Sequence, residues 1–182
     1  MSLKKETEKM IILGIDPGIA IVGYGIIEYK NSRFTTLAHG SIQTPAHTDV
    51  DVRLSMIYDQ LSELISIYHP EEMAIEELFF NTNQKTMVPV AEARGVILLC
   101  ARQNGISISE YTPLQVKQSV VGYGRAQKKQ VMHMVELLLK LESAPKLDDT
   151  CDALAIAICH ANTGNSKMRG YFNKDYYATR KN

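Results

Sequence analysis

Three strand-like stretches follow one another at the start of the chain, with no helix between them. Residues 11–15 form a short apolar run with β-branched side chains, closed by Asp16-Pro17-Gly18. Residues 21–28 and 34–42 also have strand composition, and Lys30-Asn31-Ser32 between them is typical of a hairpin. Because short connections join antiparallel strands, this order predicts an antiparallel meander as the first part of a sheet.

The rest of the chain alternates helix-like and strand-like stretches. Apolar residues at helical spacing up to Tyr68 predict a helix capped by Asp49 or Asp51. Pro89 favours a helix that begins at that residue, because proline fits the first turn. We therefore expect an α/β domain with one mixed five-stranded sheet. Its later elements are a strand at 73–76, a helix at 89–103, a strand at 106–110, and helices at 113–121, 127–141 and 149–162.

A length of 182 residues suits one domain with short extensions. Residues 1–9 are charged and lack the apolar core of a signal peptide, so we interpret them as an N-terminal extension. Residues 10–164 form the predicted domain, and residues 165–182 are a basic tail with four aromatic side chains. The chain has no run of eighteen apolar residues and no paired cysteine spacing, which favours a reduced cytoplasmic protein. The cysteines are Cys100, Cys151 and Cys159.

The formal net charge is zero, but the charges are segregated along the chain. Residues 41–80 contain eight acidic side chains and one basic side chain, whereas residues 111–140 contain five basic and one acidic. A neutral protein with such segregation can present a phosphate-binding surface. Solvated helix faces without a partner would give the same pattern.

Four acidic residues stand where apolar patterning would favour other side chains. Asp16 and Glu76 each end a strand-like run, and Asp149 and Asp152 open a helix that continues almost entirely apolar. Residues three apart share a helix face, so these last two carboxylates point the same way. Clustered carboxylates repel one another, and hard cations such as Mg²⁺ or Mn²⁺ relieve that repulsion. Two such ions, about 3.5–4 Å apart, are a common arrangement for phosphodiester hydrolysis.

Local patterns leave other interpretations open. Asp16-Pro17-Gly18 is also a turn sequence, a strand-ending acid can be a charge at a sheet edge, and acids in a first helical turn can serve as caps. Asp148 with Asp152 is as good a pair as Asp149 with Asp152, and Glu77 follows the strand acid directly. The five histidines lack the spacing of metal ligands, and we assign them no catalytic part.

Five motifs occur in a fixed order between about residues 10 and 162. They are Ile12-Leu-Gly-Ile-Asp16-Pro-Gly18 with Gly23-Tyr-Gly25; Ala74-Ile-Glu76 with Phe79; Ala91-Glu-Ala-Arg94-Gly95; Val116-Lys117-Gln118 with Val121-Gly122-Tyr-Gly124 and Ala126-Gln-Lys128; and Asp149-Thr-Cys-Asp152-Ala-Leu-Ala-Ile-Ala157. Together they resemble the RuvC family of Holliday-junction resolvases. The pair Thr150-Cys151 departs from the alanines common in that family, without removing an acid.

The resemblance implies an RNase H-like fold in which Asp16, Glu76, Asp149 and Asp152 bind two metal ions. It implies that Lys128 is an active-site lysine near the scissile phosphate. It also implies a homodimer that binds four-way junction DNA and nicks two strands of like polarity symmetrically. The products would carry 5′-phosphate and 3′-hydroxyl ends. Such a protein would work in recombination and repair beside the RuvA–RuvB branch-migration complex.

The same resemblance assigns residues to DNA and to the dimer. Phe79 would be a wedge that stacks on an unpaired base at the junction centre. The helix that carries Arg94 and Gly95 would pack against its copy in the second subunit. The residues expected to contact DNA are Phe79, Lys117, Arg125, Lys128 and Lys129, and those expected to allow close approach of the two helices are Ala91, Ala93 and Ala101.

Two other classes of protein compete with a nuclease. Sugar kinases and heat-shock ATPases also open with an apolar strand, Asp and Gly, but they need a second phosphate loop and a second lobe. Nothing after Gly105 repeats the strand-Asp-Gly pattern. A non-catalytic junction-binding protein on the same fold is the other alternative. The presence of all four acids and Lys128 favours the enzyme.

Overall fold

The computed structural model describes residues 9–78, 84–143 and 145–164. Its centre is a five-stranded sheet with the strand order β3-β2-β1-β4-β5. The first three strands form the predicted antiparallel meander, β4 runs parallel to β1, and β5 runs parallel to β4. The expected mixed sheet is thus confirmed. The strands span Met10–Asp16 (β1), Ile21–Lys30 (β2), Arg33–Gln43 (β3), Glu72–Glu76 (β4) and Ser107–Tyr111 (β5).

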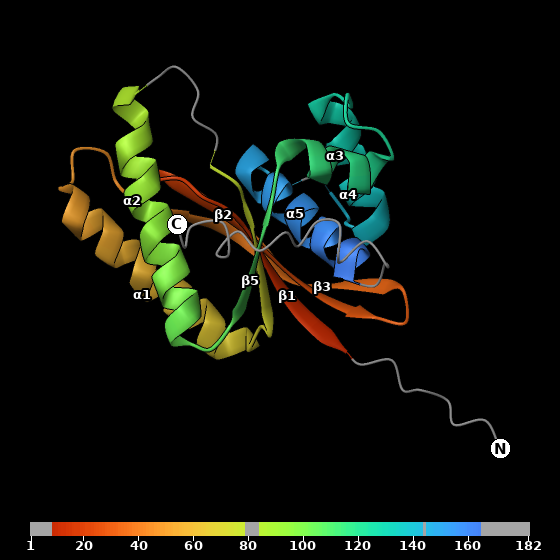
Figure 1. Cartoon of the computed structure of the whole chain (residues 1–182), viewed down its shortest axis with the longest axis horizontal. Coiled ribbons are helices and arrows are strands. Elements are labelled where there is room, and N and C mark those ends of the chain that lie inside the picture. The colour runs from red at the N-terminus through yellow and green to blue at the C-terminus, as the bar shows by residue number, and fades with distance from the viewer. Residues whose placement is uncertain (1–8, 79–83, 144, 165–182) are drawn as a thin grey trace, which may run out of the picture.

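Helices cover both faces of the sheet (Figure 1). Side chains alternate along each strand, so that Ile12 enters the core beneath α5 while Leu13 and Ile15 enter the core beneath α1 and α2. Two separate hydrophobic cores result, one on each face. The helices span Val50–Tyr68 (α1), Gln84–Gln103 (α2), Pro113–Val121 (α3), Lys128–Leu139 (α4) and Asp148–Gly164 (α5).

The start of α2 differs from the prediction. The helix begins at Gln84, five residues before Pro89, so the prediction that it starts at the proline is wrong. Proline lacks an N–H and therefore removes one backbone hydrogen bond, to the carbonyl four residues earlier. The later turns of α2 are held by the core through the fully buried Ala93 and Ile97, which offsets that loss. The other helix boundaries lie within two residues of the prediction, and Asp49 is the N-cap of α1.

Helix α5 lies unusually close to the sheet because glycines face it. A Cβ added to Gly14 of β1 would lie 2.1 Å from the carbonyl oxygen of Ala153, and one added to Gly23 of β2 would lie 2.0 Å from that of Asp149. Both distances are far below van der Waals contact, so only glycine allows this approach. The backbone of α5 therefore rests directly on β1 and β2.

Candidate active site

Asp16 and Glu76 end two neighbouring strands on the same face of the sheet. Ile15 of β1 lies beside Ile75 of β4 in the parallel register, so the residue after each of them sits at the same edge. Asp16 shares a face with Ile12, and Glu76 shares one with Ala74; both belong to the face covered by α5. Strand alternation alone thus brings these two carboxylates together beneath the start of α5.

The first turns of α5 bring the two helical acids to the same edge. Gly23, which is opposite Asp16 in the antiparallel register, is also the residue on which the backbone of Asp149 rests. The hydroxyl of Thr150 donates a hydrogen bond of 2.9 Å to the carbonyl of Gly40 and anchors this end of α5 to β3. Asp152 lies one helical turn further along.

The electrostatics of Asp16 show how closely the acids are grouped. Burial, followed by the charges of Glu76, Asp152 and Asp149, raises the pKa of Asp16 from 3.8 to about 8. Burial and then Asp152 also raise the pKa of Glu76, against the opposing effects of Lys128 and Lys117. Burial raises the pKa of Asp152 as well. These carboxylates destabilise one another in the absence of a cation.

Lys128, at the first position of α4, forms ion pairs with two acids of α5. Its Nζ lies 3.0 Å from Oδ2 of Asp152 and 3.2 Å from Oδ2 of Asp148. Burial alone would lower the pKa of Lys128, but its hydrogen bonds and ion pairs with these two acids raise it. The predicted active-site lysine therefore lies beside the clustered acids.

The choice between Asp148 and Asp149 depends on which acid faces Asp16. The side chain of Asp148 is 63% exposed and pairs with Lys128. Asp149 is less exposed, and its charge is one of the causes that raise the pKa of Asp16. The geometry favours Asp149 as the partner of Asp16 and Asp152.

The residues fit a site for hard cations, although the carboxylates are not drawn together around one point. Within the described part of the chain, no three His, Cys, Asp or Glu side chains form a compact metal-binding group. The mutual effects on pKa nevertheless connect Asp16 with the other three acids. Both observations follow if the carboxylates border a common space and repel across it. Oxygen donors in such an arrangement suit Mg²⁺ or Mn²⁺.

The other residues predicted to contact DNA lie on α3 and around the start of α4. Lys117 is close enough to lower the pKa of Glu76, and Arg125 and Lys129 are exposed near Lys128. Lys117 and Lys128 thus lie beside the acids. Phe79 lies outside the described residues.

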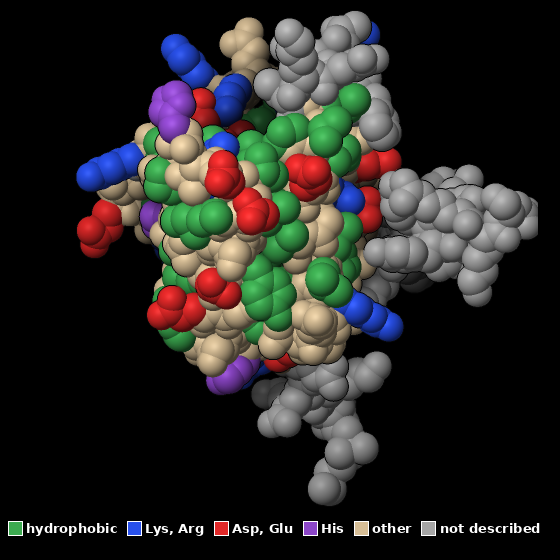
Figure 2. Space-filling view, turned by 90° about the vertical axis from the view of Figure 1, so that its left-hand side faces the viewer, with side chains coloured by type: hydrophobic (Ala, Val, Ile, Leu, Met, Phe, Trp, Pro, Cys, Tyr) green, Lys and Arg blue, Asp and Glu red, His purple; other side chains and the backbone are tan. Residues whose placement is uncertain are grey.

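The opposite side of the molecule has a different character. Figure 2 shows the side formed by α1 and α2, where hydrophobic and acidic side chains are mixed. This agrees with the acidic composition of residues 41–80 and separates that side from the basic residues of α3 and α4. Cys100, Cys151 and Cys159 are buried and free. No helix in the described residues is both long enough and apolar enough to cross a membrane.

Only part of the predicted dimer face is exposed. Ala91 and Gly95 are at the surface of α2, but Ala93 and Ala101 are fully buried in the core of the same chain. The expectation that these two alanines allow close approach of a second subunit is wrong, because they face the sheet. Arg94 is also largely buried and forms an ion pair with Glu110 of β5, in which its Nη2 lies 2.8 Å from Oε2 of the glutamate.

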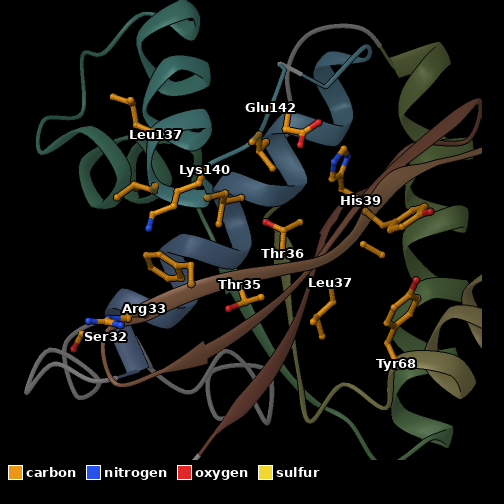
Figure 3. A pocket seen from close by; sticks show the side chains of 16 residues that line it. Ser32, Arg33, Thr35, Thr36, Leu37, His39, Tyr68, Leu137, Lys140 and Glu142 are labelled. Atoms are coloured by element: carbon orange, nitrogen blue, oxygen red, sulfur yellow. The ribbon is translucent and has the colours of Figure 1, made fainter.

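A surface hollow of about 1320 Å³ lies elsewhere, between β3 and the end of α4 (Figure 3). Its walls include Arg33, Leu37 and His39 from the edge strand, Leu137 from α4 and Lys140 directly after that helix. None of the four acids lines it. This hollow is therefore separate from the four acids.

Sequence reasoning missed a buried polar group around His160. The imidazole Nδ1 lies 2.7 Å from the hydroxyl of Tyr111, and Nε2 bonds the carboxylate of Glu72. The available signal was weak: one histidine on an otherwise apolar helix. Its partners are 49 and 88 residues away in the chain, so only the folded structure identifies them.

Comparisons with known proteins agree with this geometry. The family model described as Crossover junction endodeoxyribonuclease RuvC matches residues 12–160. The protein of that name from Clostridioides difficile is 57% identical over 154 residues, which cover 85% of this chain and 91% of that protein. The one from Caldanaerobacter subterraneus is 53% identical over 163 residues, which cover 89% of this chain and 99% of that protein.

A solved structure gives the same result for the fold. Thermus thermophilus RuvC in complex with Holliday junction substrate matches with a TM-score of 0.82 and 34% identity, covering 85% of this chain and 94% of that chain. The fold is therefore RNase H-like, as the resemblance implied. The family model, the close relatives and the structural match all lead to one conclusion: the chain belongs to the RuvC family of crossover junction endodeoxyribonucleases.

Proposed function

We propose that this chain resolves Holliday junctions by metal-dependent hydrolysis at the edge of the sheet where Asp16 lies. The observation that carries the proposal is the burial of Asp16 beside Glu76 and the two acids of α5, which raises its pKa to about 8. Such a group is stable at neutral pH only if a proton or a cation neutralises it. A divalent cation does so while leaving carboxylate oxygens to orient a phosphate.

Each residue of the site has a part in this chemistry. Asp16, Glu76, Asp149 and Asp152 would hold two Mg²⁺ ions, with Mn²⁺ as a substitute. Ions held by these residues would supply activation of the attacking water and stabilisation of the leaving 3′ oxygen. Lys128 stabilises charge on the phosphate in the transition state. Lys128 pairs with Asp148 as well as with Asp152, so Asp148 would keep Lys128 at the site if Asp152 held a cation.

The proposed substrate is four-way junction DNA, nicked symmetrically to give 5′-phosphate and 3′-hydroxyl ends. Lys117, whose charge acts on Glu76, and the exposed Arg125 and Lys129 on either side of Lys128 in the sequence would hold the phosphate backbone. Phe79 would stack on an unpaired base at the junction centre, as the family resemblance suggests.

Symmetric cleavage requires two active sites, and we propose a homodimer that forms through α2. The exposed face of this helix carries Val88 (60% exposed), Ala91, Gly95 and Leu99 (54% exposed), spaced three or four residues apart. Helix α2 lies on the side of the molecule that Figure 2 shows. An apolar stripe of this kind packs well against its own copy about a two-fold axis. We also propose that this protein works in the cytoplasm together with a RuvA–RuvB complex.

Nicking of a synthetic four-way junction by Asp16→Asn tests the function. The variant should lose Mg²⁺-dependent cleavage while it binds the junction at least as tightly, because a source of phosphate repulsion is gone. Asp59→Asn, which changes an exposed acid of α1, is the control and should cleave normally. Substantial cleavage by Asp16→Asn would overturn the proposal, and junction binding without cleavage by the unchanged protein would favour the non-catalytic alternative.

A further inference from the structure

His160 joins α5 to two strands through a buried hydrogen-bonded group. The side chain is 3% exposed, and Tyr111 of β5 is 5% exposed. In one neutral tautomer of the ring, the hydroxyl of Tyr111 donates to Nδ1 and the N–H at Nε2 donates to Glu72 of β4. Buried polar groups cost free energy unless they are paired, so this group favours one placement of the helix over the strands.

The strands that His160 contacts are the strands that carry or adjoin Glu76. Glu72 lies on the same strand and face as Glu76, four residues before it. Tyr111 is the register partner of Glu76 on β5, and its carbonyl accepts a hydrogen bond of 2.8 Å from the N–H of Glu77. The group therefore connects the strand end that presents Glu76 with the helix that presents Asp149 and Asp152.

The interface between α5 and β1 lacks such directional contacts at its centre. There the helix rests on Gly14 through Ala153 and Ala157, and small apolar surfaces fix a distance more firmly than they fix a position along the strand. Thr150 anchors the first turn of α5 to Gly40. His160, eight residues beyond Asp152, supplies an anchor near the other end of the helix.

We propose that His160 is a positioning residue for the catalytic acids: with Tyr111 and Glu72, it sets the placement of α5 along the sheet and thereby the separation between Glu76 and the acids of α5. This inference rests on the proposed function, because it assumes that those acids bind the metal ions. It predicts that loss of the group weakens metal binding more than an equal loss of stability elsewhere does.

The experiment compares His160→Ala with Val135→Ala, which removes buried volume from α4 in the same core. For each variant, unfolding temperature, Ca²⁺ binding by calorimetry and the Mg²⁺ dependence of junction nicking are measured. Groups that orient metal ligands indirectly typically change metal affinity by 10–100-fold. We expect His160→Ala to weaken Ca²⁺ binding and raise the half-saturating Mg²⁺ concentration by roughly tenfold, and Val135→Ala to lower the unfolding temperature alone.

Two conservative variants keep the test decisive if His160→Ala does not fold. Tyr111→Phe removes one hydroxyl and leaves the ring, and it should shift the Mg²⁺ dependence in the same direction by a smaller factor. His160→Gln retains a donor for Glu72 and should recover part of the metal affinity. If Tyr111→Phe and His160→Gln both bind Ca²⁺ as the unchanged protein does, the inference is wrong. Cleavage by Asp16→Asn would instead contradict the proposed function itself. The failure of the inference about His160 is therefore distinguishable from the failure of the proposed function.

Discussion

The two faces of the sheet are covered by helices in different ways. On the side of α1 and α2, large side chains such as Leu61, Ile97 and Met73 interdigitate between helix and strand. On the side of α5, Gly14 and Gly23 let the helix backbone touch the strands. Both interfaces are buried and apolar, but the acids that we propose to be catalytic lie at the rim of the second one.

This difference indicates that the two interfaces contribute differently to the stability of the fold and to the spacing of the acids. Large interdigitating side chains contribute most of their free energy through buried area, and a small change in helix position alters that area little. Contact between backbones fixes the distance between helix and strand, because atoms at van der Waals distance cannot approach further. We infer that the α1–α2 face chiefly stabilises the fold, whereas the α5 face also sets the spacing of the acids.

The largest effect should come from Gly23→Ala. The added Cβ would meet the carbonyl of Asp149, so the start of α5 must move away from Asp16. We expect a loss of cleavage of at least about 100-fold, since small displacements at a catalytic centre have effects of that order. Circular dichroism should show that the helices remain. Normal cleavage would show that the backbone contact does not set the spacing of the acids.

On the other face, Leu61→Ala should have the opposite pattern. Removal of a fully buried leucine costs about 2–5 kcal/mol of unfolding free energy. Below its lowered unfolding temperature, the variant should nick junctions at close to the normal rate. A urea titration and a cleavage assay on the same sample make the measurement. A loss of cleavage as large as that of Gly23→Ala would erase the distinction between the faces.

A moderate effect on stability is expected from Asp16→Asn without metal. The pKa of Asp16 is raised in the folded state from 3.8 to about 8, so the folded protein binds this proton more tightly than the unfolded chain does. The contribution of the protonated Asp16 to the free energy of unfolding is therefore fully present below about pH 4 and is lost as pH rises through 8. The variant has no charge to bury. In EDTA it should therefore unfold several degrees higher than the unchanged protein at pH 8, and at the same temperature near pH 4. Equal unfolding temperatures at both pH values would contradict the burial of a charged Asp16.

The smallest effect concerns the exposed basic residues beside the acids. Junction affinity should fall steeply with salt, and the removal of one phosphate-binding cation should reduce the slope of log affinity against log salt by about 0.9. Lys129→Gln should reduce the slope by that amount for each subunit. Lys30→Gln, at the exposed hairpin of β2 and β3, should leave it unchanged. Equal slopes for both variants would contradict the proposal that Lys129 of α4 binds DNA phosphate.

Much of the fold follows from local patterns in the sequence. Strand alternation and the short turn at Asn31 predict the meander, and the apolar run after Asp152 predicts the buried helix. The same patterns identify Asp16 and Glu76, because acids that end apolar strands are conspicuous. The family resemblance supplies what patterns leave open, including Asp149 in preference to Asp148.

The errors all involve contacts between segments distant in sequence. Packing against the sheet sustains α2 through Pro89, which local propensity cannot foresee. Ala93 and Ala101 look like small residues of a helix interface, and it is the position of the sheet that places them in the core. His160 gains its partners only when α5 crosses β4 and β5.

The glycine contact beneath α5 also bears on how this scaffold can change. A side-chain core offers many alternatives of equal volume, so the face beneath α1 and α2 should tolerate exchanges among Ile, Leu and Met. Gly14 and Gly23 have no smaller substitute and no room for a larger one. Redesign of the active site must therefore proceed through the exposed residues at the helix start and the loops, while the contact underneath them stays as it is.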